Sequence, residues 1–143
     1  LELFVPDGHQ PGASLICPSG TFTRVHVPTV ALDSYFDERT PISAIKIDVE
    51  GAELDVLKGA ERILRQYRPL IIVECEDRHH VRGSVHDVFS YLAALGYRGS
   101  FINGNEVLPI ERFDVAKHQR QEGEWFWKKP GYCHNFIFEP GKA

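Results

Sequence analysis

Apolar and polar positions along the chain predict a succession of strands and helices. Strand-like segments, in which apolar residues alternate with polar ones or form short runs, cover residues 1–6, 22–30, 42–49, 70–73, 97–102, 107–110 and 135–138. Two longer segments repeat apolar residues every three or four positions, as the buried stripe of a helix does, and they cover residues 52–67 and 84–95. The order from residue 42 onward predicts an α/β fold, a partial doubly wound sheet that is mostly parallel with an antiparallel C-terminal strand.

The boundaries of these segments carry ordinary start and stop signals. Pro69 prevents the first helix from continuing, and the four apolar residues after it are typical of a strand covered on both faces of a parallel sheet. Ser84 is suited to cap the second helix, and Gly96 is suited to end it. We also expect a hairpin or irregular excursion at residues 7–20, a short helical turn at 32–36 and a long loop at 111–132.

Acidic residues follow two consecutive strands at the positions where these strands end. Asp48 and Glu50 follow the first strand, and Glu74, Glu76 and Asp77 follow the second. Ligands of open parallel sheets bind beyond the carboxyl ends of the strands, and neighbouring strands lie about 4.8 Å apart, so both groups could line one pocket. Such acids could accept a hydroxyl proton, raise one another's pKa or hold a divalent cation. The alternative is that they cap the next helix and solvate the loop.

Other residues near this edge have structural interpretations, and three of them, Asp33, His79 and His80, also have functional ones. Gly51 permits a tight strand-to-helix turn, since no glycine-rich phosphate loop accompanies it. Glu53 lies at a helix N-terminus, where negative charge is stabilising. Asp33 either caps a short turn or touches the rim of a pocket. His79 and His80 either reach a substrate hydroxyl or a metal, or form a solvated pair, and neither has the helical spacing of metal ligands.

The long loop predicted at residues 111–132, called the late loop below, carries aromatic residues beside lysines. These residues are Trp125, Phe126, Trp127 and Tyr132, beside Lys128 and Lys129. They could form a lid that stacks on an acceptor ring, in which case Trp125 contacts the substrate. They could equally anchor the loop in the core or in an oligomer contact.

Composition bounds the class of protein. The chain has 143 residues, 43% of them apolar, which suffices for one domain with a core and not for two. It has no apolar run of about 18 residues and no secretory signal pattern, so we expect no membrane partner. A net charge of −4 argues against nucleic acid and favours a small-molecule partner. Cys17, Cys75 and Cys133 lack the spacing of a disulfide framework or a structural zinc site, and we expect a reducing cytoplasm.

One part of the chain resembles a known family. Residues 45–60, IKIDVEGAELDVLKGA, and residues 69–74, PLIIVE, closely resemble the signature of the FkbM family of methyltransferases, and residues 27–33, VPTVALD, are similar to the strand and turn that precede it. The resemblance covers residues 1–76 well and the remainder in outline. It implies a Rossmann-like class I methyltransferase fold, S-adenosylmethionine as cofactor, and methyl transfer to a hydroxyl of a sugar, polyketide or other small metabolite.

The resemblance also implies roles for individual residues. In such folds the acid at the end of this strand lies near the methyl donor and acceptor, so Asp48 is the first catalytic candidate, with Glu50 and Glu74 after it. The expected cofactor contacts are Asp48, Val49 and Gly51, and the expected substrate contacts are Glu53, Glu76, His79 and Trp125. Some related methyltransferases bind magnesium at these two strand ends, so Asp48 with Glu74 or Glu76 is a hypothetical magnesium site. We otherwise assign no metal ligand.

The resemblance is partial, which leaves other functions open. The first three strands of the family's fold, with the glycine-rich cofactor loop and the ribose-binding acid, have no counterpart here, and the chain opens on a strand and contains no methionine. We therefore expect residues 1–143 to be a single domain, the C-terminal portion of a methyltransferase domain excised from a longer protein. This portion could be inactive alone or complete its sheet as a homodimer. The alternatives are a non-catalytic interaction module and a metal-dependent hydrolase or lyase that uses the same acids.

Overall fold

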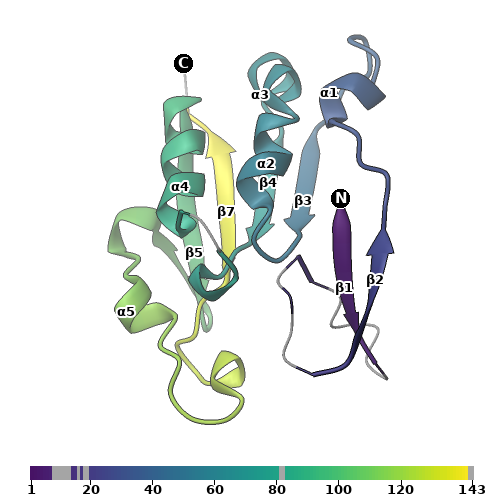
Figure 1. The fold of residues 1–143 in the computed structure, drawn as a ribbon. Helices are drawn as coiled ribbons and strands as arrows, with labels where there is room; N and C mark the ends of the chain where they lie inside the picture. Colours follow the sequence, from purple (N-terminus) through teal and green to yellow (C-terminus); the bar gives the residue numbers. More distant parts are fainter. Residues whose placement is uncertain (8–13, 16, 18–19, 81–82, 142–143) are drawn as a thin grey trace.

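The computed structural model describes residues 1–7, 14–15, 17, 20–80 and 83–141 (Figure 1). The strands are β1 (Glu2–Pro6), β2 (Phe22–His26), β3 (Ala44–Asp48), β4 (Leu70–Glu74), β5 (Tyr97–Asn103), β6 (Glu106–Pro109) and β7 (Asn135–Pro140). The helices are α1 (Leu32–Tyr35), α2 (Glu53–Lys58), α3 (Glu61–Tyr67), α4 (Val85–Ala94) and α5 (Val115–His118), with short 3-10 turns η2 (Asp77–His79), η3 (Ile110–Arg112) and η4 (Phe126–Lys128).

A mixed five-stranded sheet forms the centre of the fold, in the order β3-β4-β7-β5-β6. Strands β3 and β4 are parallel, whereas β7 runs antiparallel to both β4 and β5, and β6 runs antiparallel to β5. The predicted α/β class and the antiparallel C-terminal strand are confirmed. The sheet is less parallel than predicted, because β7 lies between β4 and β5 and runs antiparallel to both, and because β6 returns from β5 through the tight turn at Gly104, where φ is +60°.

Helices α2, α3 and α4 lie on the same face of the sheet (Figure 1). The connections from β3 to β4 and from β4 to β5 advance in the same direction across the sheet, so crossovers of the same hand place their helices on one face. Under these helices the core is fully buried and rich in aromatic residues, with Phe101, Phe136, Phe138, Ile71 and Val73 at 1% exposure or less.

The opposite face of the sheet is open in the described part of the chain. Ile72 is 36% exposed, Ile102 is 38% exposed and Val107 is 62% exposed. The expectation that residues 70–73 are covered on both faces is therefore wrong. A continuous apolar run does not reveal whether the second face has a cover, and here both crossover helices pack on the first face.

The helix predicted over residues 52–67 is instead two helices, α2 and α3, separated at Gly59 and Ala60. The carboxylate of Asp33 accepts hydrogen bonds from the backbone N–H groups of Arg62 at 2.7 Å and Ile63 at 3.0 Å. Asp33 therefore caps α3 from outside the helix, and this cap starts a new helix within one continuous apolar stripe. This role differs from both earlier interpretations of Asp33.

The second predicted helix is confirmed as α4. Ser84 and Asp87 form a capping box at its start, and Gly96, with φ of +79°, follows its end. The predicted turn at residues 32–36 is confirmed as α1. By contrast, the strand predicted over 22–30 ends at His26 and is mostly exposed, because among the described strands β2 pairs with β1 alone, in a separate ribbon outside the main sheet.

The predicted long loop at residues 111–132 contains α5 and η4. Its residue Gln119 is buried and donates hydrogen bonds from its side-chain amide to the carbonyl oxygens of Cys75 at 2.8 Å and Cys133 at 3.0 Å. The loop is therefore fixed against the end of β4. Most of the excursion predicted at residues 7–20 lies outside the described residues, although Ser14 forms a bridge with Phe4.

Candidate functional site

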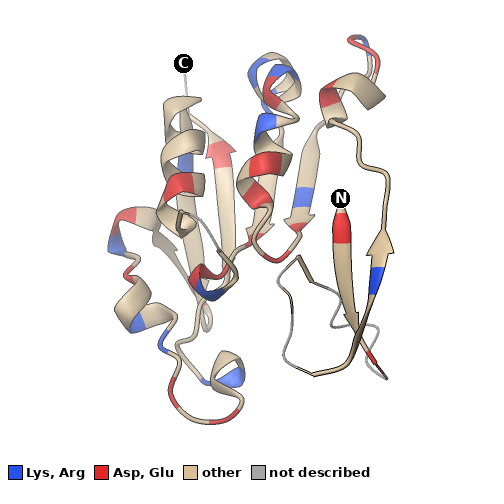
Figure 2. Ribbon diagram, viewed as in Figure 1, with Lys and Arg blue, Asp and Glu red and all other residues tan. Residues whose placement is uncertain are grey.

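The carboxyl ends of β3 and β4 bring two acidic residues together. Asp48 and Glu74 are direct partners in the parallel register of these strands. The Lys46 ammonium lies 3.5 Å from a carboxylate oxygen of Asp48 and 3.6 Å from one of Glu74. The predicted convergence of the two strand ends is confirmed. Figure 2, in which Asp and Glu are red, shows acidic residues at the end of β3 and in the loop that follows it. Lys46 offsets the repulsion between the two carboxylates.

The loop between β3 and α2 has an unusual backbone. Glu50 adopts a left-handed conformation with φ of +46°, which is uncommon for a residue with a side chain, and Gly51 has φ of +106°. A Cβ atom at Gly51 would lie 2.2 Å from the carbonyl oxygen of His79. The N–H of Gly51 donates a 2.8 Å hydrogen bond to the carboxylate of Glu53. Gly51 is thus required by the close approach of the His79 loop, and strained backbone of this kind clusters at functional sites.

Two openings that share lining residues border this acidic edge of the sheet, where Asp48 and Glu74 lie. One has a volume of about 780 Å³ and lies among β3, residues 29–32 and α2. The other has a volume of about 660 Å³ and is bounded by Asp48, Glu74, Val49 and the β1 ribbon. Asp48 and Val49 line both openings. These volumes are in the range of small-molecule sites, which is about 300–1,000 Å³.

A family model described as the methyltransferase FkbM domain matches residues 4–98. The chain belongs to the FkbM methyltransferase family. The resemblance seen in the sequence is confirmed, and the match spans β1 to the start of β5, including the acidic edge. No curated protein and no solved structure matches the chain. None of the described helices is long and apolar enough to cross a membrane.

Within this FkbM domain, Glu76 lies close to the site, but its carboxylate already has partners. Its oxygens accept hydrogen bonds from the Arg78 guanidinium at 2.7 and 3.0 Å and from the Tyr132 hydroxyl. Burial opposes ionisation of Glu76, but these hydrogen bonds outweigh it and lower the pKa of the carboxyl. Glu76 is only 6% exposed, and its hydrogen bond from Tyr132 links the late loop to the end of β4.

The aromatic residues of the late loop divide into two groups. The Arg78 guanidinium lies 5.4 Å from the ring centre of Phe126 and 5.3 Å from that of Trp127, so these rings pack beside the Glu76 network. Trp125 is 54% exposed, and it contacts the Lys128 ammonium at 4.7 Å from the ring centre and the Trp127 ring at 5.3 Å between centroids. Trp125 lines neither opening beside Asp48, so the geometry offers no support for its predicted substrate contact.

The remaining candidates lie under the acidic edge. His79 borders a small recess of about 20 Å³ that Asp48, Glu50, Glu53 and Glu74 also line. Glu53 is 1% exposed, so it is a buried acid and not a surface contact. The structure therefore brings Asp48, Glu74 and the Glu50 loop together and places Glu53 behind them.

Two residues of this region, Lys46 and Cys75, were not among the predicted site residues. Lys46 stands two positions before Asp48, on the same face of β3, and this strand periodicity was a usable signal for its contact with the acid. Cys75 is buried behind the edge, and burial raises the pKa of its thiol. Its position directly after β4 gave no comparable signal, because a lone buried cysteine is usually a core residue.

Proposed function

We propose that this FkbM domain transfers a methyl group from S-adenosylmethionine to a hydroxyl of a sugar, polyketide or similar small metabolite, on a Rossmann-like class I fold. The observation that carries the proposal is the paired acids Asp48 and Glu74 at the carboxyl edge of parallel strands, beside an opening of about 660 Å³. Ligands of open α/β sheets bind at this kind of edge.

The residues at this edge fit the chemistry of the cofactor. S-adenosylmethionine carries a positive sulfonium, which the carboxylates of Asp48 and Glu74 would stabilise. Val49, Ala52 and Val56 line both openings and would offer apolar surface to the adenine ring. The bound cofactor supplies an electrophilic methyl group. The backbone at Val49, which lines both openings, would approach it closely, whereas Gly51 lines neither opening and faces the His79 loop, so the geometry offers no support for its predicted cofactor contact.

The acceptor would be activated by the same acids. The Asp48 carboxylate, whose side chain is 54% exposed, is accessible to an acceptor hydroxyl and would accept its proton as the methyl group transfers. Glu74 and Glu50 would orient the hydroxyl, and Lys46 keeps the Asp48 and Glu74 side chains in place. Orientation and exclusion of water would supply most of the acceleration.

The geometry gives magnesium no support in this proposal. The position between Asp48 and Glu74 already holds a cation, the ammonium of Lys46. The carboxylate of Glu76 is directed to Arg78 and Tyr132. A magnesium ion bound by Asp48 and Glu74 would therefore have to displace Lys46.

Calorimetric titration of S-adenosylmethionine and S-adenosylhomocysteine tests the proposal. The two ligands differ in the positive charge of the sulfonium, so Asp48→Asn should weaken binding of S-adenosylmethionine by about fivefold more than binding of S-adenosylhomocysteine. Glu106→Gln removes an exposed acid on β6 and is the matched control, which should leave both affinities unchanged. Binding by a chain extended upstream but not by residues 1–143 would show that the cofactor site needs the preceding strands, and absence of binding by both folded chains would overturn the proposal.

A second function, that of a non-catalytic interaction module, is favoured by the sheet itself. Strand β3 is the last strand of the described sheet on its side, and one sheet face exposes Ile72, Ile102 and Val107. Exposed strand edges and apolar faces commonly bind other chains, including a second copy. Concentration-dependent association in sedimentation, without affinity for either cofactor form, would favour this function over methyl transfer.

We also propose that the protein works in the cytoplasm. Cys75 and Cys133 are buried free thiols, and a reducing compartment keeps thiols in that state.

A further inference from the structure

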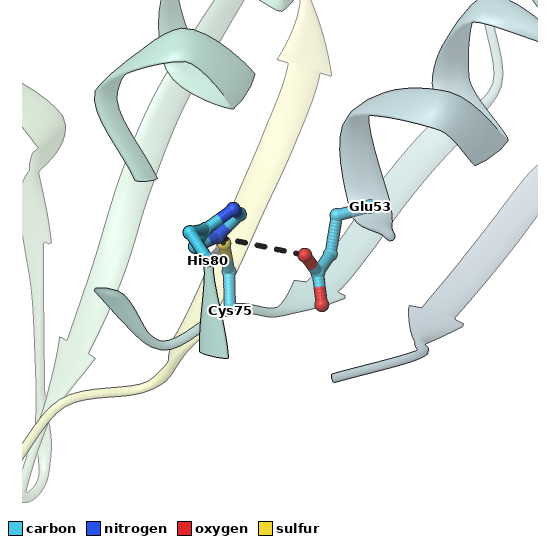
Figure 3. Close-up of side chains that lie close together, drawn as sticks. All are labelled: Glu53, Cys75 and His80. Carbon is cyan, nitrogen blue, oxygen red and sulfur yellow. Dashed lines mark hydrogen bonds and ion pairs between the residues drawn. The ribbon is translucent and has the colours of Figure 1, made fainter. Parts of the chain in front are cut away.

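Three side chains that can bind metal ions meet behind the acidic edge. Glu53 is the first residue of α2, Cys75 follows β4, and His80 follows η2 (Figure 3). The Nε2 atom of His80 lies 3.3 Å from the Sγ atom of Cys75 and 3.6 Å from the Oε2 atom of Glu53. One ligand atom from each residue lies within 4.8 Å of the other two. The side chains of His80 and Glu53 are 4% and 1% exposed, and Cys75 is 1% exposed.

One oxygen atom of this cluster is buried without a hydrogen-bond partner. The Oε1 atom of Glu53 accepts the 2.8 Å hydrogen bond from the Gly51 N–H, but Oε2 is buried and has no hydrogen-bond partner. Figure 3 shows the carboxylate of Glu53 facing His80 and Cys75 across a short gap. A buried carboxylate oxygen without a donor is costly, and such a group is normally compensated by a hydrogen bond, an opposite charge or a metal ion.

We infer that Glu53, Cys75 and His80 form a binding site for zinc or a similar divalent transition-metal ion. In a tetrahedral zinc site the ligand atoms lie about 3.3–3.6 Å from one another, given metal–ligand distances of about 2.0–2.3 Å. The 3.3 and 3.6 Å separations at His80 match this spacing. The cation would occupy the space between the three atoms and would satisfy Oε2 of Glu53.

The ligand types select the metal. A thiolate and an imidazole favour zinc and similar borderline or soft ions over magnesium and calcium, which prefer oxygen ligands. A carboxylate and a thiolate together carry two negative charges, which neutralise a divalent cation in a buried site. A water molecule would complete the tetrahedron, and the recess of about 20 Å³ bordered by Glu53 and Cys75 exceeds the space of about 10–15 Å³ that one water needs.

The metal site would join two loops that shape the acidic edge. Glu53 lies just after the strained β3–α2 loop, and Cys75 and His80 flank the β4 loop that contacts Gly51. The cation would hold the loops after β3 and β4 at a fixed separation. This inference does not depend on methyl transfer, because the site would bind a cation whatever the domain does at Asp48.

Metal analysis of the full chain is the first part of the test. We expect about one equivalent of zinc per chain after purification in zinc-containing buffer and gel filtration. Adding zinc to chelator-treated protein should raise the unfolding temperature by about 5 °C or more, whereas magnesium should not. A folded wild-type chain that retains no zinc and shows no shift in unfolding temperature with zinc would overturn the inference, in favour of a direct contact between His80 and Glu53 without a metal ion.

Cobalt substitution identifies the ligands. Cobalt bound to the wild-type chain should show a near-ultraviolet thiolate-to-cobalt absorption band, which Cys75→Ser should abolish. Cys133→Ser is the matched control, because Cys133 is also a buried free thiol, and the band should persist in that variant. Glu53→Gln should lower cobalt affinity at least tenfold while retaining the band. A cobalt band that survives Cys75→Ser would assign the metal to another site and contradict the inference.

Discussion

Asp48 and Glu74 are register partners at the ends of two parallel strands, and the ammonium of Lys46 bridges their carboxylates. This pairing follows directly from the fold, because β3 and β4 are parallel and end at the same level, which places the two acids at the same edge of the sheet. The acids line an opening of small-molecule size in a chain that belongs to the FkbM methyltransferase family. Interactions of Asp33, Gly51 and Glu76 hold the helices and loops around this edge in place, and each can be tested separately.

Removal of the Asp33 carboxylate should destabilise the fold. Asp33→Ala should lower the free energy of unfolding by about 1–2 kcal/mol, because two N–H groups at the start of α3 lose their cap. Asp33→Asn keeps one acceptor oxygen and should lose less. Chemical denaturation measures both variants. The matched control is Asp55→Ala, an exposed acid in the first turn of α2, which should change stability by about 0.5 kcal/mol or less. Equal stability of wild type and Asp33→Ala would contradict the capping role.

A side chain at Gly51 should be far more costly than one at another glycine with positive φ. Gly51→Ala should lower the free energy of unfolding by about 3 kcal/mol or more, because its Cβ would overlap the carbonyl oxygen of His79 at 2.2 Å. Gly104→Ala is the control, since Gly104 has φ of +60° with no atom within 4 Å of a built Cβ, and strain alone costs about 1 kcal/mol. Similar losses in the two variants would show that the His79 loop does not pack on Gly51.

The Glu76 carboxylate should make stability depend on acid pH. Because hydrogen bonds from Arg78 and Tyr132 hold the pKa of Glu76 below its unfolded value, its contribution is fully present above that value, about 4.3. The contribution is lost as the pH falls through the lowered pKa of the folded state. Unfolding free energies measured from pH 7 to pH 2 should therefore decline less steeply at acid pH in Glu76→Gln than in wild type. Glu106→Gln should keep the wild-type slope, and a Glu76→Gln slope equal to wild type would contradict the prediction.

Local signals in the sequence predicted much of the fold. The stripe of α4 and its cap at Ser84 are contained within one short segment, and so is the strand that ends at Asp48. The break between α2 and α3 was not predictable in the same way, since Asp33 lies 29 positions before the Arg62 amide that it caps. Long-range hydrogen bonds of this kind leave no periodic trace in the chain.

The site, like the fold, was predictable where a local pattern determines it and not where distant segments pack together. Acids at two strand ends predicted the Asp48–Glu74 pairing, because parallel strands of one sheet end at one edge. The partners of Glu76 could not be predicted, since Tyr132 reaches it from 56 positions away. The meeting of Glu53, Cys75 and His80 likewise depends on how two loops pack, and their spacing matches no metal-binding motif.

Nuclear magnetic resonance of the ¹⁵N-labelled chain tests methyl donor binding at the acidic edge most directly. Addition of S-adenosylmethionine should shift the amide signals of residues 48–52 and Glu74, and the same signals should shift much less in Asp48→Asn at equal ligand concentration. Unchanged spectra at millimolar ligand, or shifts confined to residues remote from Asp48, would contradict binding of the methyl donor at this edge of the sheet.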